Sequence, residues 1–239
     1  MHARRSLVVT SGIAALILTS LAITPAVAHE QSQSKGKDKT VTLTAQLDSL
    51  NGSGVTGKAS AVVRNQKILH VETHAAGLSP NAAHAQHIHF GAQARKECPS
   101  LVQDDSNHDG RLSTVEGTPA YGPIVVSLTT TGDTSPASSL AVSRFPLAID
   151  GVLNYSRDNI EFTDVAGTGA SGGTGSAKEI ADAIRDGKGV VVIHGIDYDG
   201  SGAYNFSQPQ GVSDLDPNLP AEATDPVTCG VLKNSLTRG

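Results

Sequence analysis

The chain contains no tryptophan, and aromatic residues make up only 3% of its 239 residues. Proteins that bind single-stranded nucleic acid stack the bases on such side chains, so a base-stacking surface is not expected. The net charge of −5 gives no argument for an attraction to the phosphates of nucleic acid. We therefore expect no nucleic-acid partner.

Long apolar runs are missing after the first 28 residues. At the start of the chain, Arg4 and Arg5 precede an apolar run over 7–23, and Ala26-Val27-Ala28 offers a small-residue cleavage site. This pattern predicts a signal peptide over residues 1–28 that is removed on export, with no stable membrane anchor, and hence a secreted protein. The polar, lysine-rich residues 29–39 predict a flexible leader.

Cysteine is also scarce, since Cys98 and Cys229 are the only two. A pair of cysteines in an exported chain usually forms a disulfide. We expect a Cys98–Cys229 bridge. It would close a loop of roughly 130 residues and stabilise the fold by about 4–5 kcal/mol in the chain-entropy model.

Glycine, threonine, serine and valine are abundant, which is typical of short strands joined by turns. Residues 41–47 alternate apolar and polar side chains, and further strands are predicted over 55–63, 68–75, 123–129, 147–152, 152–162 and 190–194. Ser176 and Glu179 form a capping box that opens a short helix ending at Gly187. We expect residues 40–239 to form a single antiparallel β-sandwich with one short inserted helix and an acidic loop over 104–117.

Three histidines indicate a metal site. His87 and His89 flank Ile88, so in a strand their side chains point to the same face, about 7 Å apart at the backbone. His194 ends the apolar run Val190-Val191-Val192-Ile193. Three imidazole nitrogens suit copper or zinc.

Four segments resemble the copper/zinc superoxide dismutase family: Gly77-Leu78-Ser79-Pro80, His87-Ile88-His89-Phe90-Gly91 with Cys98, Val192-Ile193-His194, and Cys229-Gly230-Val231-Leu232. The resemblance implies a Greek-key β-sandwich, copper ligands at His87, His89 and His194, a disulfide between the two cysteines, and superoxide or peroxide as substrate. Together with Tyr121-Gly122-Pro123-Ile124-Val125-Val126-Ser127-Leu128, the same stretches also resemble the CHRD domain of secreted proteins.

The chain departs from the dismutase pattern at two places. Only His108 lies between Cys98 and the next expected strand, where the family carries its zinc ligands. Pro226 stands where the family has an arginine that attracts the superoxide anion. We therefore expect no zinc and weak or no superoxide dismutation, and no catalytic residue is assigned.

The segment 105–116 fits the twelve-position calcium loop of EF-hands, with a glycine at position 6. The predicted calcium ligands are Asp105, Asn107, Asp109, the backbone carbonyl of Arg111, Ser113 and Glu116. Its flanks, Cys98-Pro99 and Gly117-Thr118-Pro119, do not read as helices, so we expect the loop to lie between strands. Asp197, Asp199 and Ser201, with Gln208 in the last position, match a second calcium loop more loosely, and a plain turn of Asp and Gly residues after the strand is the alternative that the sequence favours.

Two functions follow from these patterns. The first is a secreted copper-binding and calcium-binding protein that resembles the dismutases. The alternative is a non-enzymatic extracellular CHRD-like structural or interaction domain, stabilised by calcium and a disulfide. In that alternative the histidine nitrogens would be satisfied by backbone carbonyls.

Overall fold

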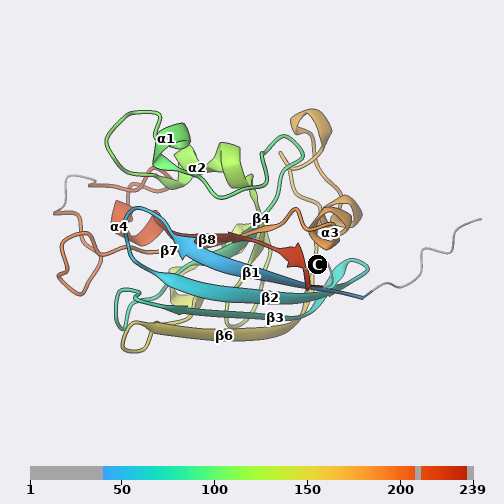
Figure 1. Cartoon of the computed structure of the whole chain (residues 1–239), viewed down its shortest axis with the longest axis horizontal. Helices are drawn as coiled ribbons and strands as arrows, with labels where there is room; N and C mark the ends of the chain where they lie inside the picture. The colour runs from blue at the N-terminus through green and yellow to red at the C-terminus, as the bar shows by residue number, and fades with distance from the viewer. Residues whose placement is uncertain (1–39, 208–210, 236–239) are drawn as a thin grey trace, which may run out of the picture. The chain divides into compact units, whose positions relative to one another are not determined.

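The computed structural model describes residues 40–207 and 211–235 (Figure 1). The predicted signal peptide, the predicted leader and Gln208 of the second acidic loop lie outside these residues. In the part of the chain that is described, no helix combines the length and apolar character needed to cross a membrane.

The described residues form a mainly β structure built on one antiparallel sheet. The strands lie in the order β5-β4-β7-β8-β1-β2-β3-β6, and β9 pairs with β1. Their bounds are β1 (Val41–Ser49), β2 (Thr56–Arg64), β3 (Lys67–Ala76), β4 (Gln86–His89), β5 (Ile124–Ser127), β6 (Val152–Glu161), β7 (Val190–His194), β8 (Pro226–Val231) and β9 (Lys233–Asn234).

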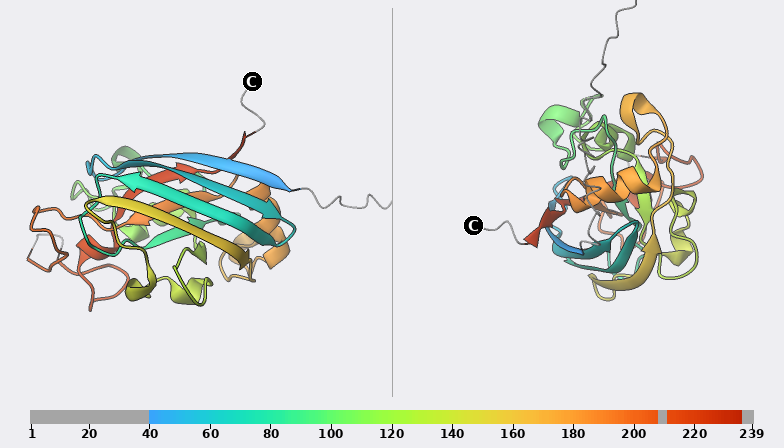
Figure 2. Two further views of the ribbon diagram at one scale, coloured as in Figure 1. Left: turned by 90° about the horizontal axis from the view of Figure 1, so that it is seen from below. Right: turned by 90° about the vertical axis from the view of Figure 1, so that its right-hand side faces the viewer.

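Strand β1 joins the two halves of the sandwich. Residues Val41–Leu47 pair with β2, whereas Asp48 and Ser49 pair with β8. Val41, Leu43, Ala45 and Leu47 are buried and alternate with more exposed side chains, as the sequence predicts. The sheet therefore curls on itself into a half-barrel, and the apolar faces of its two halves enclose the main core (Figure 2).

Strands β4 and β7 are buried on both faces, because the face that turns away from the main core is also covered. Ile88, Val191 and Ile193 belong to the main core. On the other face, Val190 and Val192 belong to a second apolar cluster with Leu50, Leu112, Tyr121 and Cys229. Figure 1 shows α1 and α2 on this side of β7 and β8, opposite β2, β3 and β6.

The sequence predicted one helix, and the structure contains more. The predicted helix is α3 (Ala177–Arg185), and its capping box between Ser176 and Glu179 is confirmed. The other α-helices of the described residues are α1 (Leu101–Asp104), α2 (Thr114–Tyr121) and α4 (Ala221–Thr224). Short 3₁₀ turns occur at Pro136–Ser138, Val142–Arg144 and Ala170–Gly172.

Two local predictions were wrong. The acidic loop lies between α1 and α2 rather than between strands, because Ser113 and Glu116 form a capping box that starts α2 despite Gly117 and Pro119 within it. Residues 147–152 form isolated bridges, Ala83 with Leu147 and Ile149 with Val152, instead of a strand. In both segments the composition of neighbouring residues suggested the wrong type of element. Hydrogen bonds in the folded chain decide which element forms.

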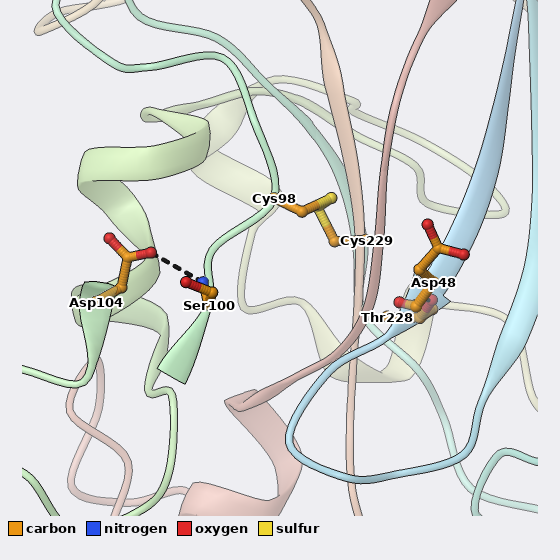
Figure 3. Close-up of a disulfide and its surroundings, with 6 residues drawn as sticks. All are labelled: Asp48, Cys98, Ser100, Asp104, Thr228 and Cys229. Carbon is orange, nitrogen blue, oxygen red and sulfur yellow. Dashed lines mark hydrogen bonds between the residues drawn. A yellow bond between two sulfur atoms is a disulfide. The ribbon is translucent and has the colours of Figure 1, made fainter. Parts of the chain in front are cut away.

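The predicted disulfide is confirmed. Cys98 and Cys229 are bonded across 131 residues of chain, with their Cα atoms 5.7 Å apart (Figure 3). Cys98 lies in the segment between β4 and α1, and Cys229 lies in β8, where it pairs with Val192 of β7. The bridge therefore ties the segment that leads into the acidic loop to the centre of the sheet.

Candidate metal centre

The structure brings the three predicted copper ligands together. His87 and His89 lie on β4, on the face opposite Ile88, and β4 pairs with β7, which ends at His194. One ring nitrogen from each histidine lies within 4.8 Å of the other two. The rings of His87 and His194 have centroids 5.1 Å apart. The site is closed, since the three residues are only 1–3% exposed.

Each histidine uses one ring nitrogen to bind a backbone carbonyl. His87 Nε2 lies 3.1 Å from the carbonyl oxygen of Ser139, and His89 Nδ1 lies 2.8 Å from that of Gly122. His194 Nδ1 lies 2.6 Å from the carbonyl oxygen of Thr224. A carbonyl can only accept, so these nitrogens carry the protons in the neutral rings.

The opposite nitrogen of each ring is buried and has no hydrogen-bond partner. These atoms are His87 Nδ1, His89 Nε2 and His194 Nε2. An unpartnered buried acceptor is costly, by about 1–3 kcal/mol, so each such group needs an explanation. Three of them in one place, each on a ring oriented by a carbonyl, is the arrangement that metal-binding histidines adopt.

Burial keeps all three imidazoles neutral. It lowers the pKa of His87 well below 6.5, with a further contribution from repulsion by His194 and His89. It lowers the pKa of His89 to about 3 and that of His194 to about 4. Neutral imidazoles are the form that binds metal ions, so these lone pairs are available at neutral pH.

The lowered pKa values predict acid sensitivity of the metal-free protein. Below pH 6.5 the unfolded chain protonates these histidines while the folded chain does not, so the folded state loses stability as the pH falls toward 4. Asp225, whose pKa burial raises to about 6, takes up one proton in the folded state and opposes this trend. Three histidines titrate against one carboxyl, so the net effect of these groups is a loss of stability as the pH falls from 6.5 toward 4.

Urea unfolding of the metal-free protein at pH 7 and pH 5 measures this effect. The variant His89→Gln removes one titrating ring and should show a shallower fall in the free energy of unfolding. Equal stability of the wild-type protein at the two pH values would contradict the neutral, buried state of the cluster.

The acidic loop after α1 has a regular hydrogen-bond pattern. Asp105 accepts hydrogen bonds from the backbone N–H groups of Asp109 (3.1 Å) and Gly110 (2.9 Å). Glu116 accepts from the backbone of Ser106 and Asn107 with one oxygen and from that of Ser113 with the other. Although burial opposes them, these hydrogen bonds lower the pKa of Glu116 below its ordinary value. The loop is thus closed on itself, and its hydrogen bonds favour the ionised form of Glu116.

The second acidic loop repeats the first, and a residue that the sequence analysis missed completes it. Asp197 accepts from the backbone N–H groups of Ser201 (3.1 Å) and Gly202 (2.7 Å). The carboxylates of Asp197, Asp199 and Glu222 lie within 4.8 Å of one another, so this group could hold a metal ion. Glu222 belongs to α4, and no spacing in the sequence indicates that it reaches the loop.

Two histidines of β3 lie outside the cluster. His70 and His74 lie on the outer side of this strand and bind the polar neighbours Asp158 and Asn154. Backbone carbonyls were expected as partners of the cluster histidines only in the CHRD-like alternative. The sequence did not indicate that they belong to Ser139, Gly122 and Thr224, because a backbone acceptor carries no signal in the side-chain sequence.

Comparison with known proteins gives no further information about the function of these residues. No protein-family model matches the chain, and no curated protein matches it significantly. The functional argument therefore rests on the geometry of the histidine cluster and of the acidic loops.

Proposed function

We propose that the chain is a secreted copper-binding protein that resembles the copper/zinc superoxide dismutases. His87, His89 and His194 are the copper ligands. The observation that carries the proposal is the set of three buried ring nitrogens without hydrogen-bond partners.

The ligand set favours copper over zinc. Within the described residues this group contains three ligands, one fewer than structural zinc sites almost always use, and catalytic zinc sites are the kind that three histidines also form. Nitrogen sites also bind Cu²⁺ more tightly than Zn²⁺. Copper, when bound, would supply the one-electron chemistry that dismutation of superoxide requires.

The chain's own residues argue for weak or no dismutation. The three rings are almost completely covered, and Phe145 packs against His87 with ring centroids 5.3 Å apart. A small anion therefore has little access to the cluster, and Pro226 occupies the place of the guiding arginine. This supports a copper-holding role, with superoxide or peroxide as a poor substrate.

The alternative is a CHRD-like extracellular domain whose histidines are purely structural. It explains the ring nitrogens that bind Ser139, Gly122 and Thr224, but it leaves the opposite nitrogen of each ring without a role. The copper proposal accounts for both nitrogens of every ring. Export through the predicted signal peptide is part of both proposals, and the Cys98–Cys229 disulfide is consistent with it.

We further propose that calcium binds the acidic loop 105–116, with Asp197, Asp199 and Ser201 as a second, looser site. In both loops the first carboxylate accepts from the backbone N–H groups at positions 5 and 6, and position 6 is a glycine with positive φ, Gly110 or Gly202. Calcium requires six to eight oxygen ligands, which such loops supply. Extracellular modules bind calcium weakly, at about 0.1–1 mM.

Calcium is expected to stabilise the folded protein. At about 10 mM calcium and a Kd of about 0.1–1 mM, the free energy of unfolding rises by about 1.4–2.7 kcal/mol, which raises the Tm by about 3–10 °C. Thermal melts with calcium and with a chelator measure this difference.

Glu116→Gln should remove most of the difference, although it also weakens the capping box of α2. The control Glu161→Gln changes an exposed glutamate of β6 outside the loop and should keep the full difference. A wild-type Tm that is the same in calcium and chelator would refute the calcium proposal.

A further inference from the structure

Helix α2 contacts two of the three histidine side chains, one near each of its ends. Thr114 is the first residue of the helix, and Gly122 follows its last residue. The Gly122 carbonyl oxygen accepts the proton on His89 Nδ1 at 2.8 Å. At the other end, the Thr114 hydroxyl oxygen lies 3.4 Å from His194 Nδ1. The two ends of α2 thus contact two different histidines of the cluster.

The Thr114 hydroxyl binds the backbone carbonyl of Thr224, which orients the ring of His194. It donates to the carbonyl oxygen of Thr224 at 2.5 Å, and the same oxygen accepts from His194 Nδ1 at 2.6 Å. Thr114, Thr224 and His194 are all at least 95% buried. Next in the chain, the Asp225 carbonyl accepts from the backbone N–H of Gly195 at 2.9 Å. The carbonyls of Thr224 and Asp225 therefore accept hydrogen bonds from His194 and the residue after it. Thr114 of α2 donates a hydrogen bond that holds this segment in place.

Tyr121 connects the two ends of the helix. Its ring centroid lies 4.4 Å from that of His89, and its hydroxyl donates to the Thr114 carbonyl oxygen at 2.7 Å. Gly117 makes room for this ring, since a Cβ there would lie 2.5 Å from the Tyr121 side chain. A displacement of Thr114 would therefore affect His89 through Tyr121 and His194 through the Thr224 carbonyl.

We propose that Thr114 is a positioning residue for the metal centre: through the Thr224 carbonyl, its hydroxyl fixes the ring of His194 with Nδ1 protonated and Nε2 turned into the cluster. The copper consequence rests on the proposed function, whereas the orientation of the ring does not require a metal.

Thr114→Val tests the proposal. It removes the hydroxyl donor and places a methyl group where the oxygen now lies 2.5 Å from the Thr224 carbonyl, so this carbonyl must move. Thr114→Ser keeps the hydroxyl and should behave as the wild type. Thr114→Ala removes the donor without the added bulk and replaces the valine variant if that one does not fold. Thr168→Val is the matched control, because Thr168 is equally buried and donates to the Val165 carbonyl at 2.7 Å in a turn outside the cluster.

The first measurement is ¹⁵N NMR of the His194 ring in the metal-free protein. We expect one tautomer, protonated at Nδ1, in the wild type, Thr114→Ser and Thr168→Val, and a mixture of tautomers in Thr114→Val. The second measurement is copper affinity, for which loss of an outer hydrogen-bond partner typically costs about 10–100-fold.

A single Nδ1-protonated tautomer in Thr114→Val, or in Thr114→Ala where that replaces it, would overturn the positioning role. If the wild type retains no copper, the proposed function fails, and the His194 signals of the metal-free protein still decide the role of Thr114. If the ring signals change as expected but copper affinity stays within about 2-fold of the wild type, the extension of this role to metal binding is overturned.

Discussion

Replacing His87 and His194 together by alanine is expected to abolish copper binding. The two rings come from different strands and supply two of the three unpartnered nitrogens. Only His89 would remain as a ligand, and it cannot hold the ion alone. Because loss of an outer partner alone costs about 10–100-fold, loss of two ligands should weaken binding by more than about 100-fold. Titration with copper in a competing chelator measures this difference.

The control for this variant is the double substitution His70→Ala and His74→Ala. These histidines lie on β3 at the surface of the sheet, so their removal leaves the number of cluster nitrogens unchanged. Circular dichroism establishes that both variants fold. Copper binding by the His87/His194 variant at the wild-type affinity would mean that the ion binds elsewhere.

Removal of the Cys98–Cys229 disulfide is expected to lower the free energy of unfolding more than any of the other substitutions does. The bridge closes a loop of 131 residues, and the chain-entropy model assigns about 5 kcal/mol to a loop of that length. For a domain of about 200 residues each kcal/mol changes the Tm by about 2–4 °C, so Cys98→Ser with Cys229→Ser should lower the Tm by about 10–20 °C. Calorimetry of the double variant measures the change.

Reduction of the wild-type protein is the matched experiment, since it opens the same bridge without changing a residue. Both samples should unfold at a similar, lowered temperature. A decrease of less than about 2 °C in both would contradict the stabilisation that loop closure in the unfolded chain predicts.

The sequence predicts the fold well where side chains alternate. Strand β1 reads clearly, because Val41, Leu43, Ala45 and Leu47 face the core and the residues between them face outward. The same period of two places His87 and His89 on one face. The capping box at Ser176 likewise predicts the start of α3.

The sequence does not predict contacts that depend on the path of the chain. Glu222 approaches Asp197 and Asp199 because α4 packs beside the second acidic loop, and no local spacing encodes that approach. Helix α2 was missed because Gly117 and Pro119 are poor helix formers, whereas the capping box outweighs them. The backbone carbonyls that orient the histidines are likewise set by tertiary structure alone.

The central claim is that three imidazole nitrogens hold one copper ion. X-ray absorption spectroscopy of the wild-type protein, loaded with copper and freed of excess metal, tests it most directly when combined with elemental analysis. The account predicts one copper per chain with three nitrogen ligands and the multiple-scattering pattern of imidazole. Absence of retained copper, or a first shell made of oxygen without imidazole scattering, would contradict it.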